Sequence, residues 1–180
     1  EMIQKLELKR EDHFLLKKFS ENIGLEFLST PYDIDSAKFL NDDLDVSMFK
    51  TASADIVDLS LQKYIAETRK PSIVSVGMAT LGEVEEVVEI YQKFNPKQLS
   101  LLHCVSNYPC SDSSLNLNVI NTLRSAFSVP VGFSDHSVGY EAAVLSVAFG
   151  VNIIEKHFTI DKNLPGPDHK ASSPPDEFFE

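Results

Sequence analysis

The sequence predicts an α/β fold with a parallel sheet. Three observations support this prediction. Short apolar runs alternate with stretches of helical period, the apolar runs are continuous, and polar residues follow most of them. Continuous apolar strands are typical of parallel sheets, which are buried on both faces. A strand and a helix that alternate six times indicate α/β organisation.

The expected strands are the apolar runs 25–29, 48–52, 72–76, 99–105, 130–133 and 152–158. The expected helices are 12–23, 34–42, 56–69, 81–94, 117–127 and 139–149. Thr80 is the predicted N-cap of the helix at 81–94, with Glu83 in its first turn. Asp35 and Ser36 are expected at the start of the second helix, and Gly150 just after the last. The segment 164–175 is rich in Pro and Ser, which predicts a loop.

Charge and composition exclude several classes of function. The 180 residues include 16 Lys+Arg and 27 Asp+Glu, a formal net charge of −11. We therefore expect no nucleic-acid partner and no anionic membrane surface. The longest apolar stretch, 142–154, falls short of the roughly 20 residues that a membrane span needs. Two cysteines, Cys104 and Cys110, are too few for a disulfide scaffold, which favours a reducing, cytoplasmic location.

Two architectures fit this pattern: an open doubly wound sheet, or part of a (β/α)8 barrel. A dinucleotide-binding sheet needs a glycine-rich turn after its first strand, and the sequence has none. Most predicted strands end instead in Ser, Thr, Lys, Asn, Asp or His. Barrel active sites are built at these strand ends, so the pattern favours a barrel. Six strands do not close a standard barrel, and we expect two further βα units before residue 1.

Lys50 and several hydroxyl groups lie at the predicted strand ends. A lysine alone at such a position is usually one that extends out of the strand into water. The hydroxyls of Thr30, Ser53, Ser75 and Ser134 are expected on the same face, where hydroxyls and one ammonium suit a phosphate or carboxylate. Each hydroxyl alone is more often a turn or cap residue. Their recurrence at four strand ends favours a phosphate site.

His136 and His157 come from consecutive predicted strands. Neighbouring strands lie roughly 4.8 Å apart, so the two imidazoles could share one transition-metal ion. Asp135 and Glu155 stand beside them and could orient their rings. The residues alone do not separate this interpretation from two structural, metal-free histidines, because no HExxH or CxxC zinc motif is present.

Cys104 and Cys110 are interpreted as structural thiols. A nucleophilic cysteine needs a base beside it, and the sequence places no histidine to activate either thiol. His103, next to Cys104, is interpreted as a residue that packs within its strand.

Seven motifs resemble, in order, those of the sialic acid synthase (N-acetylneuraminate synthase) family. They are 27–31 (FLSTP), 50–55 (KTASAD), 75–78 (SVGM), 104–109 (CVSNYP), 132–137 (GFSDHS), 154–159 (IEKHFT) and 165–169 (PGPDH). The resemblance implies that residues 1–180 are a partial (β/α)8 barrel, which family members follow with a small antifreeze-like domain in a domain-swapped homodimer. It also implies condensation of phosphoenolpyruvate with N-acetylmannosamine or a related N-acetylated hexosamine. The products are a nine-carbon 2-keto acid and phosphate, and a divalent metal, Mn²⁺ or Mg²⁺, is required.

Residue by residue, the resemblance implies that His136 and His157 hold the metal. The positions around phosphoenolpyruvate are matched by Thr30, Lys50, Ser53, Ser75, Ser106 and Ser134. The expected catalytic residues are Lys50, Asp55, Tyr108 and Asp168, of which the last three face the amino sugar. Some members have Asn at the position of Ser106 and Glu at that of Asp55.

The family's first two βα units carry an essential Glu and a phosphate-binding Lys, and its C-terminal domain lends an Arg across the dimer. No segment of this sequence matches these parts, so we expect the chain alone to be an incomplete catalyst. Two alternatives stay open. One is a non-catalytic remnant that binds metal or a phosphorylated ligand, or only dimerises. The other is a barrel aldolase that forms a Schiff base through Lys50 or Lys156.

Overall fold

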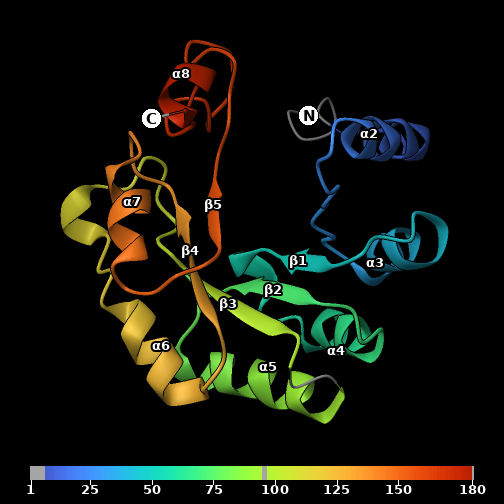
Figure 1. Ribbon diagram of the computed structural model, residues 1–180. Coiled ribbons are helices and arrows are strands. Elements are labelled where there is room, and N and C mark those ends of the chain that lie inside the picture. Colours follow the sequence, from blue (N-terminus) through green and yellow to red (C-terminus); the bar gives the residue numbers. More distant parts are fainter. Residues whose placement is uncertain (1–6, 95–96, 180) are drawn as a thin grey trace.

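The chain folds around a parallel sheet of five strands whose order in space is their order in the sequence, β1-β2-β3-β4-β5 (Figure 1). The computed structural model describes residues 7–94 and 97–179. The strands are β1 (Phe49–Thr51), β2 (Ser72–Ser75), β3 (Leu99–Cys104), β4 (Val131–Asp135) and β5 (Ile154–Lys156). Helical segments connect successive strands, so each carboxyl end lies at the same edge. This arrangement is a half-barrel and confirms the predicted α/β class.

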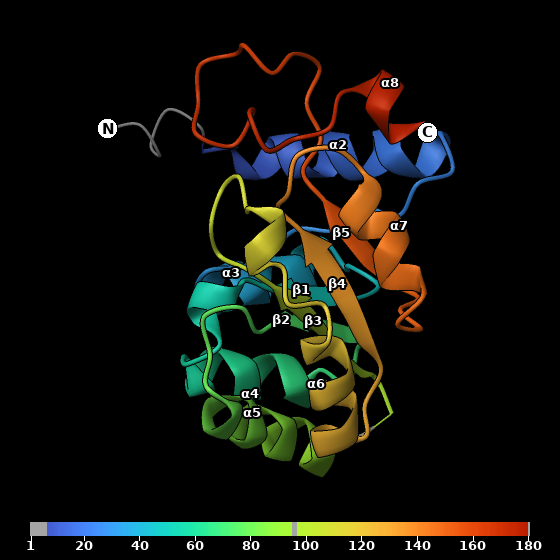
Figure 2. The same cartoon turned by 90° about the vertical axis from the view of Figure 1, so that its left-hand side faces the viewer.

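The helices are α2 (Arg10–Asn22), α3 (Ile34–Lys38), α4 (Leu59–Glu67), α5 (Leu81–Phe94), α6 (Val119–Phe127), α7 (Glu141–Val147) and α8 (Pro175–Phe178). A π-helical turn, η1 (Phe39–Asp43), continues α3, and short 3-10 turns lie at η2 (Ser53–Asp55) and η3 (Asp112–Ser114). Figures 1 and 2 show α4, α5 and α6 together on one face of β1–β3, with α7 beside β4 and β5. None of the helices that the structure describes is both long and apolar enough to cross a bilayer.

The core lies between the sheet and these outer helices. In α5, Val84, Val87 and Val88 are buried at the helical spacing of three and four residues. This spacing places one apolar stripe against the sheet. Leu61 and Ile65 do the same in α4. The helices therefore form where the sequence supplies an apolar face to cover the sheet.

Local hydrogen bonds and backbone angles confirm two predicted helix boundaries and correct a third. Thr80 and Glu83 form a reciprocal capping box at the start of α5, with the Thr80 N–H donating to Glu83 Oε2 across 2.7 Å. The predicted helix at 56–69 begins later, at Leu59, because the Asp58 side chain accepts the N–H groups of residues 60 and 61. Gly150 follows α7 with a positive φ of 76°, as expected for a C-terminal position.

One prediction about the N-terminal part was wrong. Residues 25–29 were expected to be a strand, but they have no regular secondary structure. Phe27 packs against the core, while Leu25 and Leu28 are exposed and the Ser47 hydroxyl donates to Glu26. This segment is thus attached to the rest of the fold by side-chain contacts and not by a ladder of backbone hydrogen bonds. The second helix begins at Ile34, as predicted; Asp33 is its N-cap, and Asp35 and Ser36 lie in its first turn.

The sheet has two open edges among the described residues. β1 pairs only with β2, and β5 only with β4. The predicted barrel is therefore incomplete, with five strands rather than the six expected.

Candidate functional site

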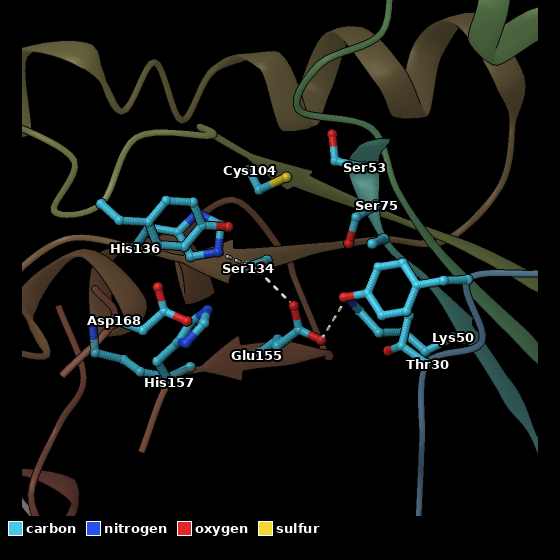
Figure 3. A pocket seen from close by; sticks show the side chains of 14 residues that line it. Thr30, Lys50, Ser53, Ser75, Cys104, Ser134, His136, Glu155, His157 and Asp168 are labelled. Atoms are coloured by element: carbon cyan, nitrogen blue, oxygen red, sulfur yellow. Dashed lines mark hydrogen bonds and ion pairs between the residues drawn. The ribbon is translucent and has the colours of Figure 1, made fainter. Parts of the chain in front are cut away.

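The carboxyl ends of the strands open onto a cavity of about 420 Å³ (Figure 3). Its walls come from all five strand ends and from the loops at residues 30–32 and 168. Nine of the eleven predicted site residues line it: Thr30, Lys50, Ser53, Ser75, Tyr108, Ser134, His136, His157 and Asp168. Convergence at this edge is what parallel strands with polar carboxyl ends produce.

Strand register explains which side chains face the cavity. Cys104, Ser134 and Glu155 are register partners across β3, β4 and β5, and all three line the cavity. Side chains alternate between the faces of a strand. His136 and His157 lie two residues beyond Ser134 and Glu155, so they emerge on the same face.

Lys50 supplies a positive charge deep in the cavity. Its side chain is 13% exposed, and its Nζ lies 3.2 Å from Glu155 Oε2. The Ser75 Oγ is buried and has no hydrogen-bond partner. Figure 3 shows this hydroxyl on the same side of the cavity as Lys50. An ammonium and a free hydroxyl in one pocket are suited to an anionic oxygen.

Ser53 and Thr30 complete this side of the cavity. Ser53 Oγ accepts a hydrogen bond of 2.6 Å from the Met78 N–H, which ties the loop after β2 to the turn after β1. Gln62 is buried beneath this turn and donates to the Asp55 carbonyl oxygen across 3.1 Å. The turn that carries Ser53 is thus fixed from two directions.

The hydrogen bonds of His136 indicate which of its ring nitrogens carries the proton. Nδ1 lies 2.7 Å from the Val105 carbonyl oxygen, which can only accept, so Nδ1 carries the proton. Burial is the main cause that lowers the pKa of His136, so the neutral ring is favoured. Nε2 then has a lone pair and faces Ser134 Oγ at 3.2 Å. Ser134 has one proton, and its shorter bond, 2.7 Å, goes to Glu155. The Nε2 lone pair is left without a donor.

This donor set fits a divalent metal ion. A histidine that donates one ring N–H to a carbonyl and leaves the other nitrogen free is the usual state of a metal ligand. The His157 ring lies 5.4 Å from that of His136, centroid to centroid and edge-on. In the part of the chain that the structure describes, no third His, Cys, Asp or Glu joins them in a ligand cluster. The two imidazoles are therefore the protein donors available here.

Tyr108 covers both histidines. Its ring centroid lies 4.1 Å from that of His136 and 5.4 Å from that of His157. Burial, with smaller contributions from Cys104, Asp168 and Glu155, raises the pKa of Tyr108 to about 12. The phenol is protonated at neutral pH and can donate a hydrogen bond into the cavity.

The loop between Thr159 and Ser173 carries Asp168 at the rim of the cavity. The loop begins and ends at a pair of backbone hydrogen bonds, Ser173 N to His157 O at 2.8 Å and Thr159 N to Ser173 O at 3.1 Å. Within it, Thr159 Oγ1 contacts His169 Nδ1 at 2.8 Å. The predicted loop is thus ordered by contacts at its base.

Two predicted site residues lie outside the cavity lining. Ser106 is exposed on the loop after β3. Asp55 closes the turn after β1, where its Oδ2 is buried without a partner. Burial, followed by the nearby charge of Asp58, raises the pKa of Asp55.

The roles expected of three neighbouring residues need correction. Asp135 does not bond to either histidine ring; it bonds to Lys156 Nζ at 2.8 Å and to Ser137. Glu155 contacts Lys50 and Ser134 inside the cavity rather than a histidine nitrogen. Its position two residues before His157 is the signal that places it on the cavity face. Cys104 lines the cavity in addition to packing in β3, and burial raises the pKa of its thiol.

The fold and the site together define a partial (β/α) barrel whose strand-end cavity brings Lys50 and an unpartnered serine hydroxyl together with a pair of histidines. Comparison with known families identifies it further. The NeuB family model matches residues 1–180, so the chain belongs to the NeuB family of sialic and nonulosonic acid synthases.

Named relatives agree with this assignment. The chain is 43% identical over 179 residues to the N,N'-diacetyllegionaminic acid synthase of Campylobacter jejuni, covering 98% of this chain and 53% of that protein. It is 36% identical over 178 residues to the pseudaminic acid synthase of the same organism, covering 99% and 52%. The crystal structure of N-acetylneuraminic acid (sialic acid) synthetase from Leptospira borgpetersenii superposes with a TM-score of 0.90 at 39% identity, covering 95% of this chain and 59% of that one. The chain spans about half the length of the curated relatives it matches.

Proposed function

We propose that this chain forms part of the barrel of a phosphoenolpyruvate-dependent nonulosonate synthase. The reaction joins phosphoenolpyruvate to an N-acetylated hexosamine and releases phosphate. The observation that carries the proposal is the convergence of Lys50, the unpartnered Ser75 hydroxyl and the His136–His157 pair in one cavity. Relatives named for legionaminic and pseudaminic acid synthesis support the reaction class, while the sugar is left at the level of an N-acetylated hexosamine.

Lys50 and Ser75 are the groups that we assign to the phosphate. Glu155 balances the Lys50 charge at 3.2 Å before substrate enters. A phosphate dianion competes with that carboxylate for the ammonium, and the Ser75 hydroxyl gains the acceptor that it lacks. Donors that are already fixed cost little reorganisation when charge develops on the departing phosphate.

His136 and His157 are the residues that we assign to the metal, Mn²⁺ or Mg²⁺. A divalent cation bound there would polarise the aldehyde of the open-chain sugar as a Lewis acid. The chain's own residues hold phosphoenolpyruvate and the sugar next to each other in the cavity. The carbon–carbon bond forms between the methylene carbon of phosphoenolpyruvate and the aldehyde carbon, whose oxygen takes up a proton to become a hydroxyl. Water then adds to the carbon that bears the phosphate, and phosphate departs by C–O cleavage.

Tyr108 and Asp168 are placed to meet the sugar. Tyr108 is 42% exposed, and its phenol is protonated at neutral pH, so it can donate to a sugar oxygen. Asp168 contributes an acceptor from the opposite loop, as Figure 3 shows beside His157. A donor and an acceptor at the rim suit a polyhydroxylated substrate.

The aldolase alternative has weaker support. Schiff-base formation needs a free amine. Lys50 is ion-paired with Glu155, and Lys156 is ion-paired with Asp135. Borohydride treatment with a 2-keto acid should therefore trap no adduct on either lysine.

Calorimetric titration of phosphoenolpyruvate into the chain in the presence of Mn²⁺ tests the proposal. Lys50→Met should weaken binding by about 10-fold or more, because a charge-assisted contact is lost. Lys70→Met is the matched control, since it removes an exposed ion pair with Asp45 far from the cavity. Binding that is equally strong in wild type and Lys50→Met would refute the assignment of the phosphate to this site.

A further inference from the structure

Asp135 and Lys156 form a buried ion pair directly behind the two histidines. Lys156 Nζ lies 2.8 Å from Asp135 Oδ2, with side chains that are 5% and 0% exposed. The two residues are register partners at the ends of β4 and β5. Each immediately precedes a histidine, His136 on β4 and His157 on β5. The pair therefore joins the two strand ends from which the histidines project.

The pair belongs to a network that encloses His136. Lys156 also donates to the Ser137 carbonyl oxygen at 2.8 Å. Asp135 Oδ1 accepts from the Ser137 N–H at 2.8 Å and from its hydroxyl at 2.7 Å. The two residues that flank His136 are thus bonded to each other and to Lys156, which fixes the backbone that carries the ring.

A second contact holds the same strands on the opposite face. Ser134 donates to Glu155 at 2.7 Å on the cavity side. Asp135 and Lys156 are the next residues along, so their side chains leave the sheet on the other side. β5 has only three residues, and β4 is its only ladder neighbour in the described chain. Side-chain bonds on both faces therefore fix an edge strand that has little backbone support.

Stability alone is a poor explanation for this pair. Removing two charges from water costs about as much as their attraction returns, so an apolar pair of equal volume is often as stable. A bonded pair with fixed geometry does provide a defined register and orientation. We propose that Asp135 and Lys156 are a positioning pair that sets the separation of His136 and His157, and thereby the affinity of this site for a divalent cation. The inference rests on the proposed metal site.

Titration of Co²⁺ into the chain tests this proposal. The double variant Asp135→Asn/Lys156→Met removes both charges together and keeps both side-chain volumes close to the originals. Two quantities are measured: the Co²⁺ dissociation constant, and the visible absorption bands of Co²⁺, which report ligand geometry. Lys70→Met is the control, because it breaks an ion pair of similar length, 2.9 Å, away from the cavity.

The double variant should bind Co²⁺ about 10- to 100-fold more weakly, as is typical when partners behind metal ligands are lost. Its absorption bands should also shift, while Lys70→Met matches wild type in both. A folded double variant with wild-type affinity and an unchanged spectrum would overturn the positioning role alone. Wild type that binds Co²⁺ no better than His136→Ala would overturn the metal site and this inference with it. If the double variant gives no cooperative melt, Asp135→Asn alone is measured against the same two outcomes.

Discussion

The ammonium of Lys50 lies 3.2 Å from the Glu155 carboxylate inside the strand-end cavity. This ion pair places a positive charge, with its counter-charge, where the proposed phosphate binds. The relationship implies that substrate and Glu155 compete for the same lysine.

Glu155→Gln should have opposite effects on phosphoenolpyruvate binding and on the stability of the unliganded chain. Without the carboxylate, phosphoenolpyruvate should bind about 10-fold more tightly, equivalent to about 1.4 kcal/mol. The unliganded chain should lose about 1 kcal/mol of unfolding free energy, since the pair is partly exposed and its attraction is screened. Calorimetry and urea denaturation measure the two effects. Weaker phosphoenolpyruvate binding by the variant would show that Glu155 assists binding instead.

Gly77→Ala should distort the wall of the cavity. An added Cβ would lie 2.5 Å from Cys104 Sγ and 2.6 Å from the Cys104 carbonyl oxygen, so backbone must move. We expect the free energy of unfolding, measured by urea denaturation, to fall by about 1–3 kcal/mol, as is typical of overpacking. Gly82→Ala is the matched control, because the nearest atom to an added Cβ at that position in α5 is Thr80 Oγ1, at an ordinary contact distance of 4.0 Å. It should gain up to about 1 kcal/mol from helix propensity. Equal unfolding free energies for the two variants would contradict this account.

His103 should make the chain less stable in mild acid. Burial lowers its pKa in the folded state, and its Nε2–H donates to the Leu115 carbonyl oxygen at 2.7 Å. The unfolded chain, with a histidine pKa of about 6.5, then binds the proton more readily than the folded chain. The contribution of neutral, buried His103 to the free energy of unfolding is therefore fully present above about pH 6.5. It falls as the pH drops toward the pKa of His103 in the folded chain.

Melting temperatures measured from pH 8 to pH 5 check this sign. His103→Gln should show a shallower fall than wild type across the range. His13→Gln, on α2 outside the core, is the control for removal of a histidine. A wild-type profile as shallow as that of His103→Gln would contradict the role assigned to burial.

Polar residues at predicted strand ends were sufficient to find most of the cavity. Lys50, Ser75 and His136 each follow an apolar run, and parallel strands bring such ends together. The roles of Asp135 and Glu155 were less accessible, because they depend on the face of the strand and on register. Asp135 directly precedes His136, and Glu155 stands two residues before His157. Asp135 nevertheless pairs with Lys156, and Glu155 pairs with Lys50.

The local sequence pattern also did not predict where the sheet begins. Residues 25–29 have the composition of a buried strand, but a strand needs a ladder partner as well as apolar residues. β1 pairs with β2 and leaves Phe27 to contact the core by its side chain alone. Pairing is a property of the whole sheet, which short apolar runs do not specify.

The most direct test of the central claim is a set of thermal melts of this chain with and without Mn²⁺ and phosphoenolpyruvate, repeated for His136→Ala and His157→Ala. A ligand that binds only the folded state must raise the melting temperature by mass action. We expect a cooperative melt in wild type, with a midpoint that Mn²⁺ and phosphoenolpyruvate together raise. In both histidine variants, Mn²⁺ should add nothing to the effect of phosphoenolpyruvate. A cooperative wild-type melt with no response to either ligand would contradict the claim that this half-barrel carries the metal and phosphate sites.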